Sequence, residues 1–146
     1  MKLNLGCGSD YKEGWINADI KKEVCDIALD MNKKLPFADN TFDYIYAKYC
    51  IEHIKKECFP KLMNELFRIS KKGCIIHIIV PLNNYWHDPT HKNPTGYYTF
   101  RYFKQFKIKQ ERVYTDVFGT IPKLLSYIFP FNILHQSYEV YLEPVK

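Results

Sequence analysis

The chain has 146 residues, of which 47% are hydrophobic, and no uninterrupted apolar stretch nears the roughly 18 residues of a membrane span, so we expect one domain over residues 1–146 without a transmembrane segment. The formal net charge is +5, but the lysines are spread along the chain, which favours a solvated lysine surface over a nucleic-acid-binding patch. The five cysteines stand singly with no C-x-x-C pair, which argues against a zinc ribbon or a disulfide framework and favours the reducing cytoplasm.

A short apolar strand and a glycine turn open the chain. Residues 3–5 predict the strand, and Gly6 and Gly8 follow in L-N-L-G-C-G, where a turn without β-carbons lets the backbone lie against a ligand. A second strand is expected over residues 15–20, and it ends near Asp19. A carboxylate at that position can accept hydrogen bonds from both hydroxyls of a ribose, so the pattern predicts a pocket for an adenosine-containing cofactor.

The familiar phosphate-binding motifs are missing from this turn. The third glycine position of G-x-G-x-x-G is occupied by Tyr11, and the chain contains no G-x-x-x-x-G-K-[ST] loop. The spacing between the two strands is also too short for a full helix, and a pyrophosphate normally rests on the N-terminus of that helix. The expected cofactor is therefore one without phosphates.

The later part of the chain predicts one parallel crossover and several further strands. Apolar residues recur at helical spacing over residues 59–70, with Pro60 in the first turn and Gly73 placed to cap the C-terminal end. Further strands are expected over residues 24–29, 42–47, 74–80 and 107–114, and as an alternating antiparallel strand over residues 138–143. The pattern predicts an α/β fold with a minimal, doubly wound, mostly parallel sheet, a final antiparallel strand and some helices lacking.

Three stretches occur at a joint spacing that is more specific than any one of them: residues 3–8 (L-N-L-G-C-G), 14–19 (G-W-I-N-A-D) and 35–43 (L-P-F-A-D-N-T-F-D). Together they resemble the class I S-adenosylmethionine-dependent methyltransferases, in particular small members with a type 11 methyltransferase domain. The resemblance covers residues 2–82 well and continues more loosely to residue 103. It implies a trimmed Rossmann-like methyltransferase fold and S-adenosylmethionine as the cofactor.

The resemblance also implies which residues hold the cofactor. Asp19 is expected at the ribose, while Asp30 and the backbone of Met31 are expected to bind the adenine. Tyr49 follows the fourth strand and is expected beside the methionine chain, because ligands of open parallel sheets lie at the carboxyl ends of strands. The full set expected at the cofactor is Leu5, Gly6, Cys7, Gly8, Asp19, Ile20, Asp30, Met31, Lys48 and Tyr49.

Three histidines are candidates for a general base, which is needed only if the nucleophile arrives protonated. His53 follows the fourth strand, and His87 and His91 belong to H-D-P-T-H after the fifth. Structural interpretations stay open, because His53 suits a helix start and Pro89 makes H-D-P-T-H a rigid turn. Two histidines and an aspartate can also bind a metal, but the turn interpretation is favoured and no metal is expected.

The function predicted from these residues is methyl transfer from S-adenosylmethionine to an oxygen or nitrogen nucleophile of a small molecule or saccharide. The alternatives are a nucleic-acid (RNA) methyltransferase and a non-catalytic cofactor-binding domain. The apolar segment 121–134 carries a single charge, Lys123, and is expected to be buried, either against the sheet or between two copies in a homodimer.

Overall fold

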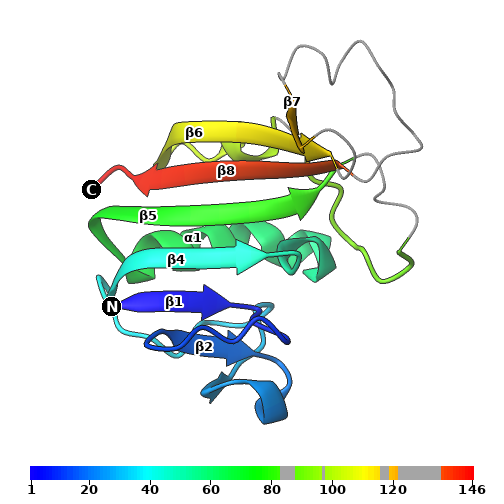
Figure 1. Ribbon diagram of the computed structural model, residues 1–146. Helices are drawn as coiled ribbons and strands as arrows, with labels where there is room; N and C mark the ends of the chain where they lie inside the picture. The colour runs from blue at the N-terminus through cyan, green and yellow to red at the C-terminus, as the bar shows by residue number, and fades with distance from the viewer. Residues whose placement is uncertain (83–87, 97, 116–118, 122–135) are drawn as a thin grey trace.

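The computed structural model describes residues 1–82, 88–96, 98–115, 119–121 and 136–146, which form one mixed sheet with a helix behind it (Figure 1). Within these residues the sheet has eight strands in the order β3-β2-β1-β4-β5-β8-β6-β7. The strands are β1 (Lys2–Leu5), β2 (Ile16–Asp19), β3 (Ile27–Ala28), β4 (Phe42–Lys48), β5 (Ser70–Pro81), β6 (Phe106–Thr115), β7 (Gly119–Ile121) and β8 (Gln136–Pro144).

The direction of the strands divides the sheet into two parts. From β3 through β2, β1 and β4 to β5, all neighbouring strands are parallel. β8 then lies antiparallel between β5 and β6, and β7 is antiparallel to β6. The winding reverses at β1, which has β2 on one side and β4 on the other. The predicted α/β fold, doubly wound and mostly parallel with a late antiparallel strand, is confirmed.

Helix α1 (Phe59–Ile69) forms the crossover between β4 and β5 and covers one face of the sheet (Figure 1). Its apolar stripe is buried against the inward-facing side chains of the strands, and Pro60 occupies the first turn, where a missing N–H is tolerated. The predicted glycine cap at the other end was wrong. Ser70 ends the helix in an extended conformation, and Gly73 lies inside β5, where its positive φ of 76° accompanies a register shift against β4.

The first two connections of the sheet are short, as expected. No α-helix lies between β1, β2 and β3, all of whose residues are described, and a single 3₁₀ turn, η1 (Lys22–Val24), precedes β3. Of the strand expected over residues 24–29, only the two residues of β3 (Ile27–Ala28) are in a strand. Within the described part of the chain α1 is the one α-helix, so the sheet face turned toward the viewer in Figure 1 has no helix over it.

A polar and aromatic cluster stands on that second face, because side chains alternate along the strands. His77 Nε2 lies 2.7 Å from Glu139 Oε1, Tyr44 hydroxyl lies 3.0 Å from His77 Nδ1, and the ring of Tyr141 stacks on the imidazole. Burial lowers the pKa of His77 despite the Glu139 hydrogen bond, which favours the neutral imidazole. Burial alone would raise the pKa of Glu139, but hydrogen bonds from Tyr114, His77 and Tyr141 lower it overall.

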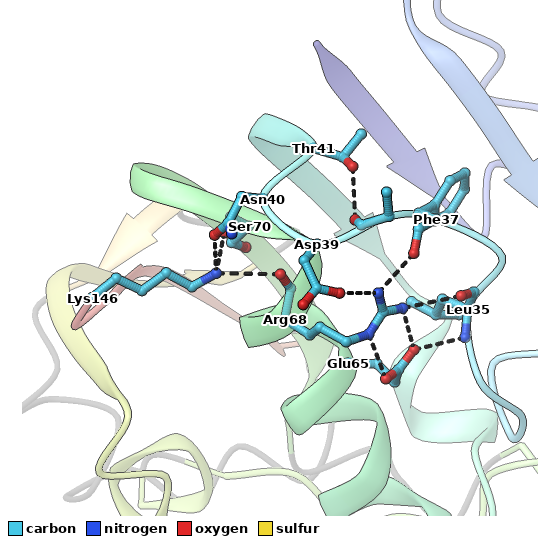
Figure 2. A network of polar contacts seen from close by, with 10 residues as sticks. Leu35, Phe37, Asp39, Asn40, Thr41, Glu65, Arg68, Ser70 and Lys146 are labelled. Carbon is cyan, nitrogen blue, oxygen red and sulfur yellow. Dashed lines mark hydrogen bonds and ion pairs between the residues drawn. The ribbon is translucent and has the colours of Figure 1, made fainter.

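Arg68, in the last turn of α1, binds the loop that carries the L-P-F-A-D-N-T-F-D motif (Figure 2). Its guanidinium donates to the carbonyl oxygens of Phe37 (2.7 Å) and Leu35 (3.1 Å) and forms ion pairs with Glu65 (2.7 Å) and Asp39 (2.8 Å). Glu65 in turn accepts the backbone N–H of Leu35 at 2.8 Å. This motif therefore has a structural role in joining the loop before β4 to the helix.

A lysine near the C-terminus supports the same junction. Lys146 Nζ donates to Asn40 Oδ1 at 2.6 Å, to the carbonyl oxygen of Arg68 at 3.2 Å and to that of Ser70 (Figure 2). The carbonyl oxygen of Arg68, in the last turn of α1, also accepts the backbone N–H of Asn40 at 2.9 Å, so Lys146 and the loop before β4 meet at the C-terminal end of the helix. The apolar segment predicted to be buried lies outside the described residues except for Ile121, which belongs to β7. Among the described residues, no helix combines the length and the hydrophobicity needed to cross a bilayer.

Candidate active site

A cavity of about 440 Å³ opens at the carboxyl ends of β1, β2 and β4, where the winding of the sheet reverses. This is the position at which open parallel sheets bind their ligands. The cavity is lined by Gly6, Gly8, Asp19, Ile20, Lys21, Leu29, Asp30, Met31, Asn32, Tyr49, Cys50, His53, Ile54 and Lys92. The list includes seven of the ten residues predicted at the cofactor and one of the three candidate histidines.

The glycine turn is held against β2 by its own backbone. The N–H groups of Gly6 and Cys7 both donate to the carbonyl oxygen of Ala18, at 2.7 and 3.1 Å. Gly6 and Gly8 have φ values of 70° and 47°, which glycine adopts without strain. At Gly6 a β-carbon would lie 2.4 Å from Cβ of Cys50, so the turn also packs closely on the residues that follow β4.

Asp19 is oriented by two backbone amides. Its Oδ2 accepts the N–H of Gly8 at 2.9 Å, and its Oδ1 accepts the N–H of Lys21 at 3.0 Å. The carboxylate therefore faces the glycine turn at the carboxyl ends of β1 and β2. Each oxygen has a second lone pair, which leaves acceptor capacity for hydroxyl groups of a ligand.

Two buried asparagines, which sequence reasoning missed, support this wall of the cavity. Asn17 is fully buried in β2 and accepts from Asn4 Nδ2 at 3.0 Å and from the N–H of Lys12 at 2.8 Å. Asp26 accepts the backbone N–H of Asn17 at 2.8 Å, a hydrogen bond that lowers the pKa of Asp26. The available signal was that both asparagines lie inside strands, where asparagine is depleted.

The residues predicted at the adenine lie on the cavity. Asp30 Oδ1 accepts the backbone N–H and the side-chain amide of Asn32, at 2.9 and 2.8 Å, and the backbone bond lowers the pKa of Asp30. The backbone N–H of Leu29 donates to the carbonyl oxygen of Asp19 at 2.8 Å, and this hydrogen bond places the loop beside β2. Asp30 and Met31 are therefore brought to the same cavity as Asp19.

Tyr49 is a strained residue at the end of β4. Its φ of 50° is unusual for a bulky side chain, and its N–H donates to the carbonyl oxygen of Ile79 at 2.9 Å. The tyrosine hydroxyl lies 2.5 Å from Ser137 Oγ of β8, which connects the cavity to the antiparallel part of the sheet. A non-glycine residue held in this conformation beside a cavity is typical of a functional position.

Three of the predicted cofactor residues do not line the cavity. Leu5 is fully buried in the core, and the Cys7 thiol points to the carbonyl oxygen of Val24 at 3.4 Å. Burial raises the pKa of that thiol to about 11. Lys48 is exposed, with its ammonium 5.4 Å from the ring centre of Tyr49. Their contact with a cofactor stays a prediction.

Two of the three candidate histidines lie beside each other beyond β4, and their role as a base stays a prediction. His53 belongs to the 3₁₀ turn η2 (Ile51–His53) and lines the cavity, and its ring centre lies 4.9 Å from that of His91. The backbone carbonyl of Glu52 accepts the N–H groups of Lys92 and Asn93, at 2.7 and 2.9 Å, which holds the H-D-P-T-H turn against η2. His87 lies outside the described residues.

Glu52 is the ionisable group that sequence reasoning passed over. Its side chain is 1% exposed, and Oε2 has no hydrogen-bond partner among the described residues. Burial raises the pKa of Glu52 to about 7. A buried carboxyl beside two imidazoles, at the edge of a cavity, is a typical setting for proton transfer or for ion binding.

A family model described as a methyltransferase domain matches residues 3–78, just over half of the chain. The chain belongs to this methyltransferase family. It is a class I S-adenosylmethionine-dependent methyltransferase, and S-adenosylmethionine is its cofactor. The matched residues contain the glycine turn, Asp19 and Asp30. No curated protein matches the chain.

Solved methyltransferases share the fold of this chain at low sequence identity. An S-adenosylmethionine-dependent methyltransferase from Archaeoglobus fulgidus is 18% identical, with a TM-score of 0.69 over 97% of this chain and 85% of that one. A methyltransferase from Methanosarcina mazei is 13% identical, with a TM-score of 0.66 over 98% and 91%. A Haloferax volcanii complex of the Trm112 methyltransferase activator with a methyltransferase gives 17% identity and a TM-score of 0.71, over 98% and 82%.

Proposed function

We propose that this methyltransferase acts on an oxygen or nitrogen atom of a small molecule or a saccharide. The observation that carries the proposal is that one cavity of about 440 Å³ is lined both by Gly8 and Asp19 and by His53. A cavity of this size encloses a small ligand, and its lining joins the expected cofactor contacts to a group that can accept a proton. The even spread of lysines along the chain favours a small acceptor over a nucleic acid.

The residues of the cavity fit the cofactor. The glycine turn lets backbone approach it closely, Asp19 offers acceptor lone pairs to the ribose hydroxyls, and Asp30 offers a carboxylate to the adenine amine. The backbone of Met31 and the ring of Tyr49 are proposed as further contacts to the adenine and the methionine chain. When bound, S-adenosylmethionine supplies a methyl group activated by its sulfonium, so the protein needs mainly to align the acceptor and exclude water.

A protonated acceptor needs a group that takes its proton. His53 is the proposed base, because it lines the cavity, and His91 stands next to it. The Thr90 hydroxyl lies 3.0 Å from His53 Nδ1 and fixes the orientation of that ring. His87 stays a candidate from the sequence alone.

Two experiments test the proposal. Calorimetry on the purified chain is expected to detect binding of S-adenosylhomocysteine and much weaker binding of NAD or ATP, and a preference for NAD or ATP would contradict the assigned cofactor contacts. The acceptor class is read from a cell extract supplied with methyl-labelled cofactor and the protein. Label in the small-molecule fraction supports the proposal, whereas label that is released by ribonuclease supports the RNA alternative. Cofactor binding without any labelled product supports a non-catalytic role.

Finer features of the proposal concern the state of the protein. We propose that residues 1–146 act as one domain in the cytoplasm, in line with five cysteines that are all free thiols. A homodimer is proposed as well, and so is an activating partner of the kind present in the Haloferax volcanii complex. Light scattering on a size-exclusion column distinguishes a dimer from a monomer.

A further inference from the structure

A carboxylate and two imidazoles converge beside the cofactor cavity from two separate segments. Glu52 and His53 belong to η2, and His91 belongs to the turn that follows β5. Each of the three offers one ligand atom, and these atoms all lie within 4.8 Å of one another. His53 lines the cavity itself, so the cluster borders the space in which the acceptor is expected.

The buried oxygen of Glu52 requires a partner. Leaving a buried polar atom unsatisfied costs about 1–3 kcal/mol, and more when the group is charged. Oε2 of Glu52 has no partner among the described residues, and its side chain is 1% exposed. The other oxygen, Oε1, lies 4.0 Å from Nε2 of His91, too far for a hydrogen bond. Nε2 of His91 also lies 3.6 Å from Oδ2 of Asp88. A cation between Glu52 and the imidazoles would give the buried Oε2 of Glu52 the partner it lacks among the described residues.

A second layer of contacts orients one of the imidazoles. The Thr90 hydroxyl donates to Asp88 Oδ1 at 2.6 Å, and it therefore accepts from Nδ1–H of His53 at 3.0 Å. Neutral His53 then has its free lone pair on Nε2. A metal-binding histidine commonly donates its other ring N–H in this way, which fixes the tautomer that can bind the ion.

We propose that Glu52, His53 and His91 bind a divalent transition-metal ion such as Zn²⁺, Co²⁺ or Mn²⁺. Two imidazoles with one carboxylate favour such ions over Mg²⁺ or Ca²⁺, which prefer oxygen ligands. Ligand atoms about 2.1 Å from one ion lie about 3.4 Å apart in a tetrahedron, so the cluster must contract by little more than 1 Å. Three protein ligands leave at least one coordination position for a molecule in the cavity.

The task of the ion rests on the proposed function. An acceptor hydroxyl bound to the open position would have its pKa lowered by the metal, as a metal-bound water does, and would lose its proton to solvent. The resulting oxygen would be the nucleophile. In the loaded protein the metal therefore replaces the imidazole of His53 as the activating group, and the acceptor is a hydroxyl compound.

Binding of the metal alone tests the proposal without any methyl transfer. The full chain, stripped with a chelator, is titrated with Co²⁺, and the visible absorption and the metal content after gel filtration are measured. We expect about one ion per chain, an absorption free of thiolate charge transfer, and a rise in melting temperature on loading. Glu52→Gln and His91→Ala are expected to weaken binding by at least roughly tenfold.

Glu57→Gln is the matched control, because it makes the same chemical change at an exposed glutamate in the neighbouring turn η3 (Lys56–Cys58). It is expected to bind Co²⁺ as the parent does. Thermal melting of the metal-free variants checks that each is folded, and S-adenosylhomocysteine binding is measured on the same samples. Absent binding, binding unchanged in Glu52→Gln, or thiolate bands would overturn the metal site. Intact metal binding with lost cofactor binding would instead count against the proposed function.

Discussion

Substituting the two glycines of the turn after β1 separates folding from cofactor binding. Gly6 has φ 70°, and a β-carbon built on it would lie 2.4 Å from Cβ and 2.7 Å from Sγ of Cys50. Gly8 has φ 47°, and a β-carbon there meets no atom within 4 Å. Both glycines line the cavity. Gly6→Ala is therefore expected to disturb the protein itself, and Gly8→Ala to disturb mainly what binds to it.

The magnitudes follow from two terms. The left-handed conformation costs an alanine about 1–2 kcal/mol at either position. At Gly6 the clash involves the β-carbon of Cys50, which cannot swing away, so the end of β4 must shift at the cost of overpacking, about 1–3 kcal/mol. Gly6→Ala should thus lose about 2–5 kcal/mol of unfolding free energy, and Gly8→Ala about 1–2 kcal/mol.

Urea unfolding gives the stabilities, and calorimetry with S-adenosylhomocysteine gives the affinities. Gly8→Ala should weaken binding at least tenfold, or about 1.4 kcal/mol, because its methyl group enters the space expected for the cofactor. Equal stability of the two variants would refute the argument from close packing at Cys50. Parental affinity in Gly8→Ala would refute the placement of the cofactor against this turn.

Three further predictions follow from other contacts. Asp19→Ala should lower the affinity for S-adenosylhomocysteine by about 2–4 kcal/mol, since hydrogen bonds to a charged group contribute about 1.5–3 kcal/mol each; an unchanged dissociation constant in calorimetry would contradict this. Arg68→Met should destabilise the chain by about 2–4 kcal/mol in urea, whereas Asp39→Ala, whose side chain is 69% exposed, should cost under about 1 kcal/mol. Burial lowers the pKa of His77 in the folded protein, so as the pH falls His77 is protonated in the unfolded chain before it is protonated in the folded one. The parent's advantage in unfolding free energy over His77→Gln should therefore shrink as the pH falls from 7 to 5, by at most about 1.4 kcal/mol per pH unit. An advantage that does not change with pH would refute this prediction.

The parts of the fold that the sequence predicted depend on local patterns. The apolar stripe of α1 and the alternation of apolar and polar residues in β8 determine which side chains can be buried, whichever elements pack against them. The helix cap predicted at Gly73 does not form, because the pairing of β5 with β4 outweighs the local preference of glycine for a helix end. Pairing of β5 with β4 begins at Ser70, opposite Phe42, and the chain is already extended when it reaches the glycine.

The candidate site divides in the same way. Gly6, Gly8 and Asp19 could be predicted because a turn and a strand end lie close in sequence and meet through neighbouring strands. His91 was a candidate from the sequence, but its meeting with Glu52 could not be predicted, because all of α1 and β5 separate the two residues in the chain. Their meeting depends on backbone hydrogen bonds from Lys92 and Asn93 to the carbonyl oxygen of Glu52, for which the sequence carries no pattern. A glutamate inside the apolar run C-I-E-H-I was the available signal, since it places a carboxylate where burial is expected.

The lack of a helix after the glycine turn bears on which cofactor this cavity can hold. Residues 9–15 form turns and no helix, so no helix N-terminus offers its free N–H groups and positive dipole to a phosphate. The N–H groups of Gly6 and Cys7 are already used by Ala18, and that of Gly8 by Asp19. A dinucleotide would leave its pyrophosphate without donors at this turn. S-adenosylmethionine presents a ribose and an amino acid instead, and the oriented carboxylate of Asp19 suits the ribose hydroxyls. Within the described residues, the same short connections that place no helix over one face of the sheet therefore also direct the cavity toward a cofactor without phosphates.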